Sequence, residues 1–122
     1  MWIATIYGFF SVVCAYEDGW EPQQQIDVTQ VMIRASQREH LVALQERFPV
    51  LDIYNILNSS TADYQWRIIC PKETWAECLK ELALEVEYSN FKETCALKFG
   101  YYHNYVQALG KTWQIFLGLQ NQ

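Results

Sequence analysis

Hydrophobic positions cluster over residues 2–15, where β-branched and aromatic side chains predominate and Gly8 interrupts them. This composition predicts a strand, with a bulge or a close backbone contact at the glycine. Residues 17–25 collect Asp, Gly, Pro and Gln, so an exposed connection is expected there. Apolar and polar side chains then alternate over residues 29–35, which predicts a second strand.

A helix should follow this second strand. Ser36 and Glu39 have the spacing of a capping box, in which each side chain satisfies a backbone N–H at the helix start. Hydrophobic residues continue at three- and four-residue intervals until Pro49 ends the pattern. Residues 1–48 are therefore predicted to form a strand–strand–helix unit.

The same order is predicted a second time over residues 51–87. Strands are expected at 51–57 and 64–70, separated by a polar turn at 58–63. Pro71 suits the first turn of the next helix, where its missing N–H would have no partner anyway. The hydrophobic face of that helix is given by Trp75, Cys78, Leu79, Leu82 and Val86.

Residues 88–122 are predicted to form a helical tail that breaks and restarts near YSNFKE. The hydrophobic side chains of its last helix recur every three or four residues, at Tyr102, Tyr105, Leu109, Trp113 and Phe116. A helix so rich in aromatic side chains needs a partner surface, in the same chain or on a second subunit. A role in packing is favoured over a cofactor-binding role.

Together these elements predict one α+β domain over residues 1–122, a length that can bury a sizeable core. The two strand–strand–helix units would build a two-layer sandwich with helices on one face of the sheet. We expect a four-stranded, mainly antiparallel sheet, a ferredoxin-like variant to which the C-terminal helix is added.

Composition and charge narrow the class of protein. With 51% hydrophobic and 16% aromatic residues, the chain is too apolar for a disordered segment. Its formal charge of −5 gives no global attraction to nucleic acid or to an anionic membrane, although a local basic patch is compatible with it. No signal peptide and no membrane-spanning run of apolar residues is recognised, so no membrane partner is expected.

The cysteines point to a reducing compartment. Cys14, Cys70, Cys78 and Cys95 form no CxxC pair, and the chain has only two histidines, so a zinc site lacks its usual spacing. Reduced thiols in the cytoplasm are favoured over a disulfide-bonded exported domain.

One face of the predicted sheet carries arginines beside aromatic residues. Alternation in the strands separates an apolar set from a mixed set that would point away from the helices. The mixed set is the candidate binding face: Tyr7, Phe9, Met32, Arg34, Arg67 and Ile69. Protein interfaces are enriched in Arg and aromatic residues, which favours a homodimer or another protein partner. Nucleic-acid or nucleotide binding by stacking and phosphate contact is the alternative, and a solvated face is the third interpretation.

No catalytic constellation stands out. Ser11 lacks the GxSxG elbow that exposes a nucleophile. Asp52 and Asp63 bracket the second strand pair and could hold a metal ion, although Asp63 is more simply a turn residue. Arg38 could attract an anion to a helix start, but no glycine-rich loop precedes it. His40 is expected to be exposed. No cofactor is expected, and no residue is assigned to catalysis, cofactor binding or a metal.

Three short motifs carry a resemblance to a known group of proteins. They read M-W-x-x-T-x-x-G-F-F-S, D-Y-x-x-R-x-x-x-P and Y-x-N-F-K, and they comprise Trp2, Thr5, Gly8, Phe9, Phe10 and Ser11, then Asp63, Tyr64, Arg67 and Pro71, then Tyr88, Asn90, Phe91 and Lys92. In these positions the chain resembles an uncharacterised family of small bacterial and phage-borne proteins. The resemblance implies a bacterial, cytoplasmic, single-domain protein, and it implies no activity.

The sequence thus favours a non-enzymatic protein-interaction or dimerisation module. Two alternatives remain open: a nucleic-acid or nucleotide binder that uses the open sheet face, and a small metal-assisted hydrolase around Asp52 and Asp63.

Overall fold

The computed structural model describes residues 1–17 and 25–121. The connection predicted at residues 17–25 therefore lies outside the described residues except for its two ends. The chain divides into two compact units, Met1–Val86 and Glu87–Gln122, and each is described by itself.

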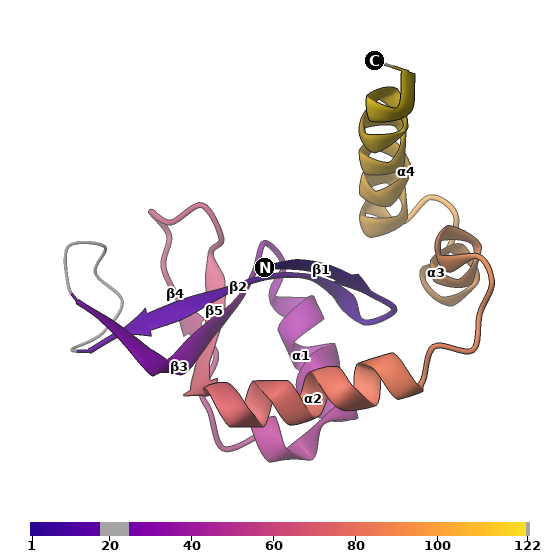
Figure 1. Cartoon of the computed structure of the whole chain (residues 1–122). Coiled ribbons are helices and arrows are strands. Elements are labelled where there is room, and N and C mark those ends of the chain that lie inside the picture. Colours follow the sequence, from indigo (N-terminus) through magenta and orange to yellow (C-terminus); the bar gives the residue numbers. More distant parts are fainter. Residues whose placement is uncertain (18–24, 122) are drawn as a thin grey trace. The chain divides into compact units, whose positions relative to one another are not determined.

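The first unit confirms the α+β class and the antiparallel sheet (Figure 1). Its described strands are β1 (Trp2–Thr5), β2 (Gly8–Tyr16), β3 (Ile26–Ala35), β4 (Leu57–Asn58) and β5 (Trp66–Pro71), in the sheet order β1-β2-β3-β5-β4. All four neighbouring pairs are antiparallel. The described sheet has five strands where the sequence pattern predicts four.

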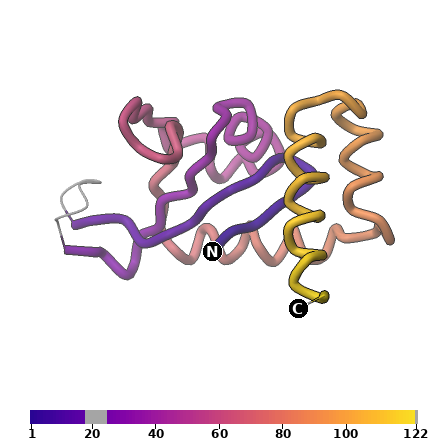
Figure 2. Tube along the Cα trace, turned by 90° about the horizontal axis from the view of Figure 1, so that it is seen from above, coloured from indigo at the N-terminus to yellow at the C-terminus, as the bar shows by residue number. Residues whose placement is uncertain are grey.

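The additional strand arises because residues 2–15 form a hairpin instead of one strand. The trace runs along β1 and returns beside it along β2 (Figure 2). At the turn, Thr5 Oγ1 accepts hydrogen bonds from the backbone N–H groups of Tyr7 (3.0 Å) and Gly8 (3.1 Å). Gly8 has a φ of +151°, and the side chain of His40 lies against its Cα. The predicted close contact at this glycine is therefore present, but it lies in a turn where the chain reverses direction.

Two helices, α1 (Arg38–Arg47) and α2 (Lys72–Leu84), cover one face of the sheet (Figure 1). Alternate residues of β3 and β5 point into the core that they enclose, as the alternation predicts. The core includes Val31, Ile33 and Ala35 from β3, Ile68 and Cys70 from β5, Leu41 and Leu44 from α1, and Trp75, Cys78 and Leu82 from α2.

Two local predictions in this unit are wrong. The N-cap of α1 is Gln37, without a side-chain cap, because Ser36 stands one residue too early to reach the free N–H groups. Residues 51–57 are not a strand: the 3-10 helix η1 (Pro49–Leu51) and a turn lead to β4. Gln45 Nε2 donates to the carbonyls of Leu51 (3.2 Å) and Tyr54 (2.9 Å), so a side chain satisfies these backbone groups in place of a β-ladder.

The second unit is a helical hairpin formed by α3 (Phe91–Phe99) and α4 (Asn104–Leu117), followed by η2 (Gly118–Asn121). The break predicted near residues 88–92 is the start of α3, where Asn90 Oδ1 accepts a hydrogen bond from the backbone N–H of Glu93 (3.0 Å). The rings of Phe99 and Tyr105 meet edge to face at 5.2 Å and hold the two helices together.

Across the described ranges, no helix has both the length and the apolar character that crossing a bilayer requires.

Candidate interaction surfaces

The face of the sheet that α1 and α2 leave uncovered carries five of the six predicted site residues. Met32 and Arg34 of β3 lie directly opposite Ile69 and Arg67 of β5. Phe9 of β2 shares this face, because its neighbour Phe10 points into the core. The open face of the sheet is the name used here for these five residues. Phe9, Arg34 and Ile69 are half-buried, and Met32 and Arg67 are buried.

Tyr7, the sixth predicted residue, does not lie on the open face. It sits in the turn between β1 and β2, and its ring packs against the core on the side of the helices. The prediction assumed one continuous strand, in which Tyr7 and Phe9 would point the same way. The hairpin turn removes that alternation.

The two arginines of the open face lie side by side, and both donate to groups of the protein itself. Arg34 donates from Nη2 to Ser11 Oγ (2.8 Å), and its guanidinium lies over the ring of Tyr64 at 4.9 Å. Arg67 donates from Nη2 to the Tyr64 carbonyl (2.8 Å) and is only 4% exposed. Burial, followed by the positive charge of Arg34, lowers the pKa of Arg67. The pair gives the face a local positive charge, but one of its two guanidinium groups is largely enclosed.

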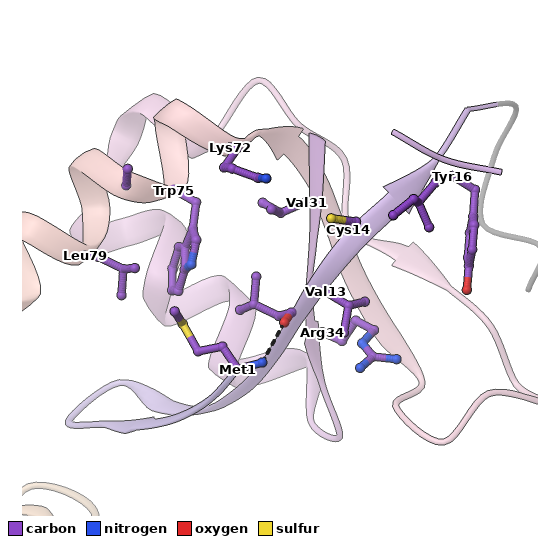
Figure 3. Close-up of a pocket in the computed structure, with 12 residues that line it drawn as sticks. Met1, Val13, Cys14, Tyr16, Val31, Arg34, Lys72, Trp75 and Leu79 are labelled. Carbon is purple, nitrogen blue, oxygen red and sulfur yellow. Dashed lines mark hydrogen bonds between the residues drawn. The ribbon is translucent and has the colours of Figure 1, made fainter. Parts of the chain in front are cut away.

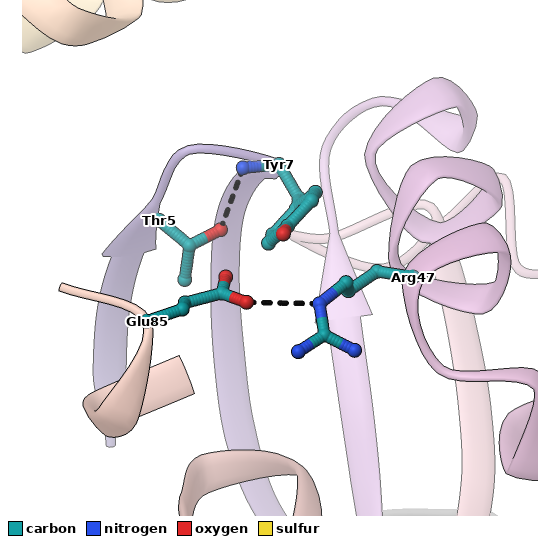
Figure 4. A network of polar contacts seen from close by, with 4 residues as sticks. All are labelled: Thr5, Tyr7, Arg47 and Glu85. Carbon is teal, nitrogen blue, oxygen red and sulfur yellow. Dashed lines mark hydrogen bonds and ion pairs between the residues drawn. The ribbon is translucent and has the colours of Figure 1, made fainter. Parts of the chain in front are cut away.

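Tyr7 instead belongs to a polar cluster that joins three elements (Figure 4). Arg47, at the end of α1, forms an ion pair with Glu85, the C-cap of α2, with 2.8 Å between Nε and Oε2. Burial and the hydrogen bond with Glu85 raise the pKa of Tyr7, so the phenol holds its proton more tightly than usual. This cluster ties the hairpin turn to both helices and brings no nucleophile to a surface.

His40 is not exposed as predicted. Its side chain is only 6% exposed, and Nδ1 accepts a hydrogen bond from the backbone N–H of Phe9 (3.3 Å). The imidazole therefore supports the hairpin. Arg38, at the start of α1, is exposed.

The two predicted metal ligands do not lie in a cluster with other possible metal-ligating side chains. Asp52 follows η1, and Asp63 lies in the connection between β4 and β5. In residues 1–17 and 25–121, no group of three or more His, Cys, Asp and Glu side chains is arranged to hold a metal ion. The four cysteines are free thiols, and burial raises the pKa of Cys70 to about 11, which suppresses its nucleophilic thiolate form. The geometry gives no support to a metal-assisted hydrolase.

A groove of about 750 Å³ lies beside the outer edge of β2, between this edge and α2 (Figure 3). Its lining is mainly apolar and includes Val12, Cys14, Val31, Trp75 and Leu79. Trp75 is only 3% exposed, and its indole N–H has no hydrogen-bond partner in the described structure. Arg34 and Lys72 are the charged side chains of the lining in the part of the chain that the structure describes.

The groove was missed by sequence analysis because it depends on where β1 stops. β1 pairs with β2 only as far as Val12, which exchanges two backbone hydrogen bonds with Met1, of 2.8 and 3.0 Å. Beyond Val12 the outer side of β2 has no strand beside it in the described residues. No local pattern in residues 12–16 predicts that this part of β2 lacks a neighbouring strand.

The second unit exposes an apolar surface on α4. Lys92, near the start of α3, lies over the ring of Trp113 at 3.7 Å, so the residues after Trp113 extend past the N-terminal end of α3. The exposed hydrophobic side chains from this point onward are Trp113, Ile115, Phe116, Leu117 and Leu119. Trp113 is 48% and Phe116 is 55% exposed. The α4 surface is defined by these five residues.

Comparisons with models of protein families, with curated proteins and with solved structures give no match to this chain.

Proposed function

We propose that the protein is a non-enzymatic protein-interaction module that forms a homodimer through the α4 surface. The observation that carries this proposal is the exposure of large apolar side chains along one helix. Contiguous apolar patches are rare on proteins that act as monomers, and they mark surfaces that bind a partner.

Burying one exposed Phe, Leu or Ile side chain stabilises an assembly by about 1.5–3 kcal/mol before the costs of association. Trp113, Phe116 and Leu117 lie within about 100° of one another around α4, so two copies that meet on this side would bury six large apolar side chains, three from each chain. This is enough to offset the loss of translational and rotational freedom, which costs roughly 4–15 kcal/mol.

The charge of α4 also suits a second copy. The whole chain has a formal charge of −5, but Asn104–Leu117 contains a single charged residue, Lys111. Lys111 lies well around the helix from Trp113 and Phe116, at about 100° per residue. Two α4 surfaces can therefore meet with little electrostatic repulsion.

Sedimentation equilibrium over a range of protein concentrations tests the homodimer. We expect the wild-type chain to reach twice the monomer mass, and Phe116→Glu to remain monomeric because it places a charge in the interface. Gln114→Glu is the matched control, since it adds the same charge to the polar side of α4. A wild-type chain that stays monomeric at every concentration contradicts the proposal, and so does a Phe116→Glu variant that dimerises like the control.

Nucleic-acid or nucleotide binding on the open face is a second candidate function. The adjacent guanidinium groups of Arg34 and Arg67 favour it. The burial of Arg67 and the position of Tyr7 favour a protein partner instead. If nucleic acid binds, Arg34→Ala should weaken binding to a single-stranded oligonucleotide and reduce its dependence on salt. Absence of any binding at low salt would remove this candidate.

Two further proposals concern the variant of the fold and the cellular compartment. The order β2-β3-α1 followed by β4-β5-α2 supports a variant of the ferredoxin-like sandwich, to which β1 adds an edge strand. The four free thiols support a reducing, cytoplasmic environment.

A further inference from the structure

The outer edge of β2 offers backbone hydrogen-bonding groups to an added strand. Val12 directs its N–H and C=O toward β1, where they pair with Met1. Alternate residues of a strand direct their backbone groups to the same side, so Cys14 also directs its groups to this outer edge. The register with β3 shifts between Cys14 and Ala15, but the N–H of Glu17 donates to the carbonyl of Gln25 on the β3 side (2.8 Å), so the neighbouring Tyr16 again faces the outer edge. The register with β1 ends before both residues, and no other described strand lies beside them.

The groove next to this edge can receive side chains of such a strand. Val12, Val31 and Trp75 are buried and form its floor, while Leu79 of α2 forms a wall. In Figure 3, Trp75 and Leu79 lie on the side of α2, and Val13, Cys14 and Tyr16 follow β2. A residue opposite Cys14 would point to the same side of the sheet as Cys14, toward α2 and the apolar floor.

The charged side chains of the groove lining indicate which kind of peptide segment can bind there. Among the described residues, the charged side chains of the lining are Arg34 and Lys72, and both are cationic, although the protein as a whole is acidic. In Figure 3, Lys72 extends from the start of α2 beside Val31, and Arg34 lies with Val13 on the other side of β2. The carboxylates of an added strand whose apolar residues face the groove would point away from α2, to the side of Arg34, which attracts acidic side chains and repels basic ones.

We propose that the β2 edge binds an extended segment of another protein in which apolar and acidic residues alternate. The segment adds to the sheet as a strand antiparallel to β2, with its apolar side chains in the groove. This inference rests on the proposed role in protein interaction, but it uses a surface that does not involve α4.

The test uses the full-length ¹⁵N-labelled chain and the synthetic peptide acetyl-Val-Glu-Val-Glu-Val-amide. We expect this peptide to shift the amide resonances of Cys14 and Tyr16 and to slow their hydrogen exchange. The valines would lie opposite these residues, so their N–H groups would point toward β2. N-methylation of the central valine should therefore weaken binding about tenfold, while N-methylation of a glutamate should not.

Variants that change the charge of a single side chain test whether the acidic residues of the peptide contribute to binding. Arg34→Gln should weaken binding of the acidic peptide several-fold and reduce its preference over acetyl-Val-Lys-Val-Lys-Val-amide. Arg38→Gln is the matched control, because Arg38 is exposed and lies outside the groove lining.

Three results would overturn the inference. The first is an acidic peptide that leaves the Cys14 and Tyr16 amides unchanged. The second is equal binding of the acidic and basic peptides to the wild-type chain. The third is protection of both amides in the free protein that grows with its concentration, which would make a second copy the occupant. A monomeric wild-type chain that still binds the acidic peptide through β2 would refute the α4 homodimer and support this inference.

Discussion

A single methyl group at position 8 is expected to destabilise the first unit strongly. Gly8 has a φ of +151°, which side chains of L-residues rarely adopt. A Cβ at this position would lie 2.2 Å from Cγ and 2.5 Å from Cβ of His40. The imidazole cannot move freely, because it is buried and accepts a hydrogen bond from the N–H of Phe9.

The magnitude follows from two contributions. Holding a non-glycine residue in a sparsely populated backbone conformation costs about 1–3 kcal/mol. Forcing additional volume into a packed site costs about another 1–3 kcal/mol. Gly8→Ala should therefore lower the free energy of unfolding by about 2–6 kcal/mol, a large part of the 5–15 kcal/mol that roughly spans native domains.

Urea denaturation followed by circular dichroism measures this loss. Gly100→Ala is a control for backbone strain alone, since Gly100 has a φ of +103° but no atom within 4 Å of the added Cβ. His40→Gly tests the steric contribution: it removes the ring and the Cβ that the added methyl group would meet, so Gly8→Ala should cost about 1 kcal/mol less in that background. A Gly8→Ala variant within about 0.5 kcal/mol of wild type would refute the reasoning. An equal cost in both backgrounds would refute the steric part.

Three further predictions concern other parts of the chain. Arg47→Met and Glu85→Gln should each lower the free energy of unfolding slightly in urea denaturation, with a double-mutant loss smaller than their sum. An additive double mutant would show that the ion pair contributes nothing. Because the pKa of Cys70 is about 11 in the folded state, above the usual 9.0, the unfolded chain loses this proton first and stability should fall between pH 9 and pH 11. Cys70→Ala should reduce that fall by about 2–3 kcal/mol in denaturation at several pH values, and an unchanged pH dependence would count against the raised pKa. Gly110→Ala in α4, where the added Cβ meets no atom within 4 Å, should stabilise the helix by about 0.5–1 kcal/mol; faster hydrogen exchange of the α4 amides would contradict this.

Local periodicity predicts the parts of the fold that depend on neighbours in sequence. The alternation in residues 29–35 and 64–70 assigns the inward and outward side chains of β3 and β5 as the structure has them. Helical spacing likewise predicts α1, α2 and α4. In these segments the period of the hydrophobic residues and the geometry of the element agree, and burial of the apolar set determines the result.

The candidate site depends much less on local pattern. Met32, Arg34, Arg67 and Ile69 share a face because period-two alternation within two strands is enough to place them. Tyr7 leaves that face because of a turn that requires His40, a residue more than thirty positions away along the chain.

Side chains remote in sequence decide the remaining features. Gln45 satisfies the backbone near Leu51 and prevents the strand that the apolar run 51–57 predicts. The groove exists because β1 ends opposite Val12 while β2 continues to Tyr16 and α2 passes beneath the unpaired edge. The sequence by itself determines which segments can form strands and helices. Strand pairing and burial depend on contacts between residues that are distant in sequence. Only the tertiary structure therefore decides where a strand ends and which strand edge remains unpaired.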